Sequence, residues 1–169
     1  MAFSRGSFTV QLEGILTNAG DLSTPRSTVN VSQAQELASG TGANQADGVW
    51  SDLISVGAGS SSDINLIGGL TDPFGNAIAA MAEIAAIYVR NQDTLTAIEV
   101  GGAVSNAVAS LFGNTSDTLV IPPGGLALLA APGASAYSIT SSTDVLRITR
   151  AAGSPTDTDV EVGIIFRTS

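Results

Sequence analysis

The stretch from Asp117 to Arg150 constrains the fold more than any other part of the chain, because turn residues divide it into short apolar runs. The first run ends at Pro122-Pro123-Gly124-Gly125 and the second at Pro132-Gly133. Proline has no N–H to donate to a β ladder, and glycine lets the backbone reverse at little steric cost. The four runs are residues 119–121, 126–131, 136–139 and 145–149. Short strands between closely spaced turns are typical of an antiparallel β-sandwich or barrel.

The rest of the chain extends this all-β pattern. Alternation of apolar and polar residues predicts further strands at residues 8–12, 27–31, 49–56, 63–67, 84–91, 94–100 and 160–167. Because only Asn91-Gln92-Asp93 separates strands 84–91 and 94–100, we expect these two strands to pair as a hairpin. The loop 101–114 ends in Leu111-Phe112, which we expect to tuck into the core.

Residues 1–45 differ from residues 46–169 in having little apolar surface for a compact core. One or two short strands, and either a helix or an extended segment at 31–38, are compatible with this sequence. A long irregular segment next to a compact domain suggests an arm that lies on something else, or else a mobile terminus. We therefore expect an irregular N-terminal arm over 1–45 and a β-sandwich domain over 46–169.

Three absences limit the chemistry that this chain can perform. It has no cysteine and no histidine, and its six cationic residues are all arginines. Serine and cysteine nucleophiles paired with histidine, histidine-ligated zinc, Walker lysines and Schiff-base lysines are therefore impossible within one chain. We expect a protein that is not an enzyme and that uses no cofactor.

The net charge and the share of charged residues limit which partners the chain can bind. The net charge is −9 with a pI of about 4.1, and the arginines are scattered, so we expect no nucleic-acid partner. Charged residues make up 12% of the chain, against about 25% in typical soluble domains. Either uncharged polar residues cover the surface, or much of it is buried against other subunits. The apolar stretch 77–89 contains Glu83 and is too short to span a bilayer, so we expect no membrane association and a protein made in a cytoplasm.

Several carboxylates and arginines are candidates for chemistry or for ordinary surface pairing. Asp157, Asp159 and Glu161 have the spacing of one strand face, which suits either a calcium site or a half-exposed strand. Glu83 and Glu99 would face each other in the expected hairpin, but few aromatic residues surround such a carboxylate pair as a sugar platform.

The remaining candidates concern pairing and packing. Arg147 and Arg150 flank the end of a strand, where Asp144 is the expected partner. Trp50, the only tryptophan, is either a core residue or an interface anchor.

Residues 45–169 resemble a family of small virion structural proteins of tailed bacteriophages. The motifs that carry the resemblance are Asp47-Gly48-Val49-Trp50, Leu70-Thr71-Asp72-Pro73-Phe74-Gly75, Ile87-Tyr88-Val89-Arg90-Asn91, Ile98-Glu99-Val100-Gly101-Gly102, Phe112-Gly113, Ile121-Pro122-Pro123-Gly124-Gly125, Ala131-Pro132 and Tyr137. These are turn and core motifs. Members of this family look like capsid decoration (cement) proteins or other head and tail accessory proteins.

The resemblance implies a jelly-roll-like sandwich that assembles as a homotrimer on the outer capsid surface, with the major capsid protein as its other partner. It thereby implies a virion location and a role in stabilising the shell by bridging capsomers. A head-fibre or tail-fibre module that binds a host receptor or glycan is the alternative. Nothing in residues 1–45 matches the family, and their composition suggests an arm that grips the capsid, with Phe3, Phe8 and Leu12, together with Trp50, as interface candidates.

Overall fold

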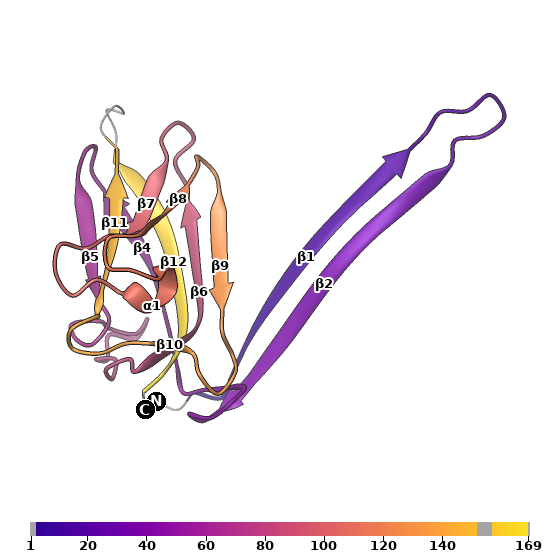
Figure 1. Ribbon diagram of the computed structural model, residues 1–169. Coiled ribbons are helices and arrows are strands. Elements are labelled where there is room, and N and C mark those ends of the chain that lie inside the picture. Colours follow the sequence, from indigo (N-terminus) through magenta and orange to yellow (C-terminus); the bar gives the residue numbers. More distant parts are fainter. Residues whose placement is uncertain (1–2, 152–156, 169) are drawn as a thin grey trace.

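The protein consists of a β-sandwich, here called the body, and a long β-hairpin that projects from one end of it (Figure 1). The structure is a computed structural model that describes residues 3–151 and 157–168. Almost all of its regular structure is β, which confirms the predicted all-β sandwich class. In the described residues, no helix is both long and apolar enough to cross a membrane.

The body contains two antiparallel sheets, which we call sheet 1 and sheet 2. Sheet 1 contains β4 (Gly48–Val56), β12 (Thr158–Arg167) and β6 (Glu83–Asn91) in that order, and then β9 (Leu126–Ala130) and the short β10 (Tyr137–Ser138), which both pair with β6. Sheet 2 has the order β5 (Ser61–Asn65), β11 (Val145–Arg150), β7 (Ile98–Gly101) and β8 (Thr118–Ile121). The turn-rich stretch thus contributes strands to both sheets, because its Pro-Pro-Gly-Gly turn carries the chain from one sheet to the other.

The expected hairpin between strands 84–91 and 94–100 is wrong. β6 lies in sheet 1 and β7 lies in sheet 2, so residues 92–97 cross between the sheets instead of reversing within one. Consecutive long strands of the body lie in opposite sheets, with β7 and β8 as the exception. The body is therefore a two-sheet antiparallel sandwich in which most connections cross from one sheet to the other.

One hydrophobic core lies between the two sheets, because each strand turns alternate side chains inward. Sheet 1 contributes Trp50, Ile87, Val162 and Ile164 among others, and sheet 2 contributes Ile64, Ile98, Leu146 and Ile148. The one-turn helix α1 (Ala109–Phe112) packs Leu111 and Phe112 against this core, as predicted. The body therefore has its own closed core.

The hairpin, which we call the arm, is far more regular than the sequence indicated. β1 (Arg5–Thr17) pairs antiparallel with β2 (Arg26–Ser39) along its entire length of 13 residues, and the helix considered for 31–38 is a strand instead. The short β3 (Gln45–Ala46) pairs in parallel with the end of β2 and leads into the body. An isolated two-stranded hairpin is marginally stable in water at best, so this arm requires a physical explanation.

Candidate functional site

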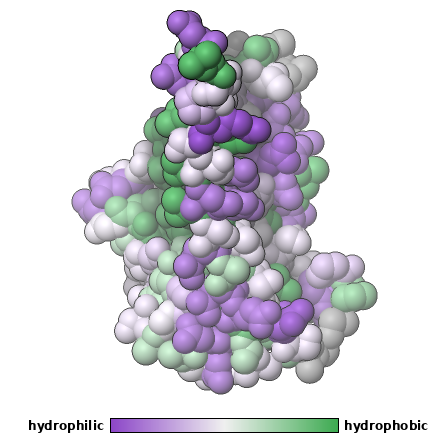
Figure 2. Space-filling model, turned by 90° about the vertical axis from the view of Figure 1, so that its right-hand side faces the viewer, coloured by the Kyte–Doolittle hydropathy of each residue, from purple (hydrophilic) through white to green (hydrophobic). Residues whose placement is uncertain are grey.

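The arm has one apolar face and one polar face. Residues directly opposite each other in an antiparallel pair share a face, so the register assigns every side chain. One face, here called the arm face, consists of Gly6, Phe8, Val10, Leu12, Gly14 and Leu16 of β1 with Leu37, Gln35, Gln33, Val31, Val29 and Ser27 of β2. None of these twelve residues is charged, whereas Arg5, Glu13, Arg26 and Glu36 all lie on the other face. Figure 2 shows the resulting hydrophobic side of the projecting hairpin next to hydrophilic side chains.

The arm face is buried where it meets the body and exposed along the rest of its length. Leu37 is completely buried and Phe8 is half-buried, whereas Val10 is 48% exposed and Leu12 68% exposed. Val31, which is directly opposite Leu12, is 60% exposed. An apolar stripe that is buried at one end and uncovered along the rest is the kind of surface that marks a protein contact site.

At its root, the arm packs against the outer side of sheet 1. Leu37, Ala46 and Ala85 form a small buried cluster to which Phe3 and Ile165 add partly buried side chains. The backbone of Gly6 lies close to this cluster, since a Cβ at Gly6 would lie 3.4 Å from the Ile165 side chain. The first residues of the arm face are therefore held against sheet 1 by direct contact.

A buried arginine fixes the same root. The Arg167 guanidinium is fully buried and forms an ion pair with Glu83 at 2.8 Å. It also donates hydrogen bonds to the carbonyl oxygens of Gln45 at 2.9 Å, Pro132 at 2.8 Å and Gly133 at 2.8 Å. One side chain thereby joins β12, β6, β3 and the loop after β9, which sets the direction in which the arm leaves the body.

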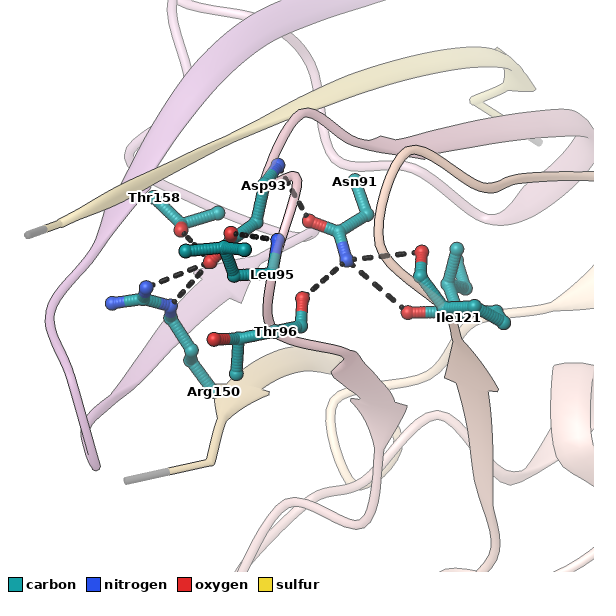
Figure 3. A network of polar contacts seen from close by, with 8 residues as sticks. Asn91, Asp93, Leu95, Thr96, Ile121, Arg150 and Thr158 are labelled. Atoms are coloured by element: carbon teal, nitrogen blue, oxygen red, sulfur yellow. Dashed lines mark hydrogen bonds and ion pairs between the residues drawn. The ribbon is translucent and has the colours of Figure 1, made fainter. Parts of the chain in front are cut away.

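A second polar network locks the opposite end of β12 (Figure 3). The buried Asn91 amide donates to the carbonyl oxygens of Thr96, Ile121 and Pro122, and its own oxygen accepts the Asp93 N–H. These bonds connect the two loops that cross between the sheets.

Asp93 continues this network toward β11 and β12. Its carboxylate accepts hydrogen bonds from the Thr158 hydroxyl at 2.6 Å, the Leu95 N–H at 2.8 Å and the Arg150 guanidinium at 2.7 Å. The Thr158 bond first, and then the bonds from Leu95 and Arg150, hold the pKa of Asp93 well below its ordinary value, although burial acts in the opposite direction. The network is structural, since each of its polar groups bonds to the protein itself.

The outer faces of the two sheets differ in chemistry. The outer face of sheet 1, read from the register, consists of Val49, Ser51, Leu53, Ser55, Asp159, Glu161, Gly163, Ile165, Ala86, Tyr88, Arg90, Leu126, Leu128 and Ala130. Two of its three charges, Arg90 and Glu161, pair with each other at 3.9 Å, and the third, Asp159, lies near the start of β12. The outer face of sheet 2 carries Asp63, Arg147 and Glu99 among polar residues, with Val120 and Val145 as its larger apolar side chains. Solvated sheet faces are normally polar, so the apolar outer face of sheet 1 is the unusual one.

An open groove of about 500 Å³ lies beside the arm root, between residues 3–5 and the loop 72–79. It contains two carboxylates, and both serve the local structure. Asp47 accepts hydrogen bonds from the backbone N–H and hydroxyl of Thr168. Asp72 accepts the N–H groups of Phe74 and Asn76, and the Asn76 bonds lower its pKa. With its carboxylates engaged in this way, the groove offers a partner chiefly apolar contact, with Phe74 72% exposed in its lining.

The structure separates the carboxylates and arginines that the sequence grouped. Glu83 and Glu99 belong to different sheets, and Glu83 is paired with Arg167, so the expected facing pair does not form. Arg147 pairs with Asp63 at 2.7 Å, and Arg150 pairs with Asp93 at 2.7 Å, so Asp144 is the partner of neither. The sequence missed both pairings because the partners are 84 and 57 residues away along the chain.

The calcium candidates lie along the outer side of β12 and of the residue before it. Asp157 and Asp159 are exposed, and Glu161 is half-buried and paired with Arg90. Within residues 3–151 and 157–168, no group of three or more acidic, histidine or cysteine residues is placed to hold a metal ion.

The interface candidates fall into three environments. Trp50 is 3% exposed, so of the two alternatives, core residue and interface anchor, it is a core residue. Phe3 packs at the root, while Phe8 and Leu12 lie on the arm face. The other apolar residues of the arm face were missed, although Val10 and Val29 repeat the alternation of Phe8 and Val31 and could have revealed them.

Comparison with protein-family models found no match to this chain, and comparison with curated proteins found no relative.

Proposed function

We propose that this protein is a non-enzymatic structural protein of a tailed bacteriophage virion, a capsid decoration protein that binds the outer surface of the shell and stabilises it by bridging capsomers. The arm is the observation that carries the proposal. It extends an apolar face beyond the body of its own subunit, and such a face gains stability only from a neighbouring molecule.

The rigid attachment of the arm to the body supports the proposed bridging role. The Leu37 cluster and the four polar contacts of Arg167 fix the arm to sheet 1, so a molecule that holds the arm also holds the body. A flexible tether would let the body swing freely. A fixed arm suits a protein that joins neighbouring subunits in one geometry.

The body supports the same proposal by analogy. Apart from the two-residue β10, the body has eight strands in two sheets with crossing connections, which resemble the jelly rolls that occur in viral capsid proteins, although this fold also serves other functions. The turn motifs of residues 45–169 add the resemblance to small virion proteins. An acidic chain with a net charge of −9 is also suited to a shell surface, since it does not compete for the packaged genome.

The test is co-sedimentation of the purified full chain with shells that lack it, followed by thermal melting of the shells. We expect saturable pelleting and a higher melting temperature, because a ligand that binds only the assembled shell stabilises it by mass action. Shells that melt at the same temperature with and without saturating protein would contradict the cement role. Binding to host cells without any binding to shells would favour the fibre alternative.

A further inference from the structure

Two apolar sheet faces of the described chain lie largely uncovered, and both adjoin the arm root. One is the arm face beyond Phe8, and the other is the outer face of sheet 1. We propose that these two surfaces are complementary, so that the arm of one copy packs its arm face on the outer face of sheet 1 of a second copy. The partner of the arm is then a second copy of this chain, a proposal that deepens the proposed function. The contact between copies forms whether or not a shell is present.

The root contact already shows how the two surfaces fit. Leu37 and Gly6 belong to the arm face, and Ile165 belongs to the outer face of sheet 1. These residues pack together within one chain, with Leu37 fully buried. An arm from a second copy would repeat this apolar contact of ribbon on sheet with the residues that the first copy leaves exposed.

The arm cannot complete this contact within its own subunit. From Val10 outward the arm face is about half exposed or more, and the arm diverges from the body (Figure 1). Sheet 1 meanwhile leaves Val49 54% exposed and Leu126 60% exposed on its outer face. Each copy therefore presents both a donor surface and an acceptor surface.

The uncharged arm face and the apolar outer face of sheet 1 suit each other better than the arm face suits sheet 2. Two copies with a net charge of −9 repel each other in general. The twelve residues of the arm face carry no charge, and the outer face of sheet 1 carries the Arg90–Glu161 pair and Asp159, which lies at the end of β12 away from the arm root. The arm face can therefore approach sheet 1 without bringing like charges together, and it meets apolar side chains there, whereas the outer face of sheet 2 is mostly polar.

The size of the arm indicates how copies must be arranged. The eight paired residues from Val10 to Thr17 span about 27 Å at about 3.4 Å per residue, and two strands are about 10 Å wide, so the uncovered part of one arm face covers on the order of 300 Å². A stable interface takes about 800 Å² per partner. A copy that both gives an arm and receives one doubles its contact to roughly 600 Å², much nearer that area than a single arm, so the exchange is expected in a closed assembly in which every copy does both.

The first measurement is the mass of the purified full chain by light scattering and sedimentation, without shells. We expect a closed assembly whose mass is at least twofold that of the 16.9 kDa chain. Changing Leu12→Ser together with Val31→Ser, which are opposite each other on the arm face, should weaken assembly by roughly a hundredfold or more, since two buried apolar side chains are lost. The matched control is Ile15→Ser, which makes the same kind of change on the polar face at 49% exposure and should leave assembly unchanged.

The acceptor surface is tested with Gly163→Gln. In the single chain the nearest atom to an added Cβ is that of Tyr88 at 4.0 Å, so the new side chain fits its own subunit but stands on the outer face of sheet 1. We expect it to abolish assembly, whereas Val120→Gln on the outer face of sheet 2 should not. Trp50 fluorescence checks that each variant keeps its core.

Cross-linking then identifies the contact. The chain has no cysteine, so copies with Leu12→Cys alone can be mixed with copies with Gly163→Cys alone and treated with a bifunctional thiol reagent. We expect mixed cross-linked pairs, which can only form between copies.

Two outcomes overturn the exchange: a wild-type chain that stays monomeric at every concentration, or an assembly that both surface variants leave intact. The proposed function fails separately. An assembly that does not pellet with shells would rule out the decoration role and leave the arm exchange standing. A monomer that pellets with shells would rule out the exchange and leave the decoration role standing.

Discussion

The arm and the body are both built from strands that alternate apolar and polar side chains, yet they are stabilised in opposite ways. In the body, β12 alternates buried and outward-facing residues, and the buried set packs against the second sheet. In the arm, β1 alternates in the same manner, but beyond Phe8 none of the residues that the structure describes covers its apolar set. Alternation of apolar and polar residues specifies which face of a strand must be buried. It does not specify whether the residues that bury this face belong to the same chain.

The arm root joins the part of the hairpin that packs against the body to the part that does not. Arg167 and the Leu37 cluster hold the first residues of the arm face against sheet 1, so the arm begins as part of the body's packing and then leaves it. The account therefore predicts large effects on stability in the body and root, and small ones along the arm.

The largest effect is expected at the root. Arg167→Met leaves the Glu83 carboxylate and three carbonyl oxygens without their partner, so the free energy of unfolding should fall by about 3–5 kcal/mol. Arg147→Met is the matched control, since its pair with Asp63 is partly exposed and should contribute about 1 kcal/mol or less. Urea titrations compare the two, and equal losses would contradict the root's role.

Leucine truncations give a direct comparison of the two regions. Leu146→Ala opens a cavity at a completely buried site and should cost about 3 kcal/mol. Leu22→Ala removes the same atoms at the fully exposed tip of the arm and should cost less than about 0.5 kcal/mol. Chemical denaturation followed by Trp50 fluorescence measures both, and a large loss at Leu22 would mean that the tip is packed in the free protein.

A smaller, pH-dependent effect is expected at the far end of the body. Because the pKa of Asp93 is lower in the folded than in the unfolded protein, its carboxylate stabilises the fold fully above the unfolded pKa of about 3.9. That contribution is lost as the pH falls toward the folded pKa. Asp93→Asn should therefore weaken the dependence of the melting temperature on pH below about pH 4, as calorimetry can measure. An unchanged acid dependence would show that Asp93 does not contribute.

The fold class was predictable because turn chemistry is local. Pro122-Pro123-Gly124-Gly125 ends one strand and begins another whatever the rest of the chain does, and β8 and β9 lie on its two sides. Pairing was less predictable, since Asn91-Gln92-Asp93 looks like a hairpin turn. The chain instead crosses to sheet 2 there, held by the bonds of Asn91 to two distant carbonyls, one at the end of β8 and one at the start of the β8–β9 loop.

The arm was only partly predictable for a different physical reason. Phe8 and Leu12 were identified, but Gly14 and the glutamines at 33 and 35 dilute the apolar pattern, so the two strands looked short and irregular. Their regularity comes from pairing with each other over 13 residues, which no single stretch of sequence displays. Likewise, the partners of Arg150 and Arg167 come from distant strands and depend on the tertiary fold.

Hydrogen exchange of the full-length chain tests most directly whether a second copy covers the arm. The wild-type chain and the Leu12→Ser, Val31→Ser variant would be compared at the same concentration by mass spectrometry. The account predicts slow exchange at residues 9–34 in the wild type, fast exchange there in the variant, and equal exchange in the body, since only the arm loses its cover. Equal exchange of the arm in both proteins would contradict the proposal that a second copy covers the arm face. The protection of the arm would then not depend on its apolar side chains.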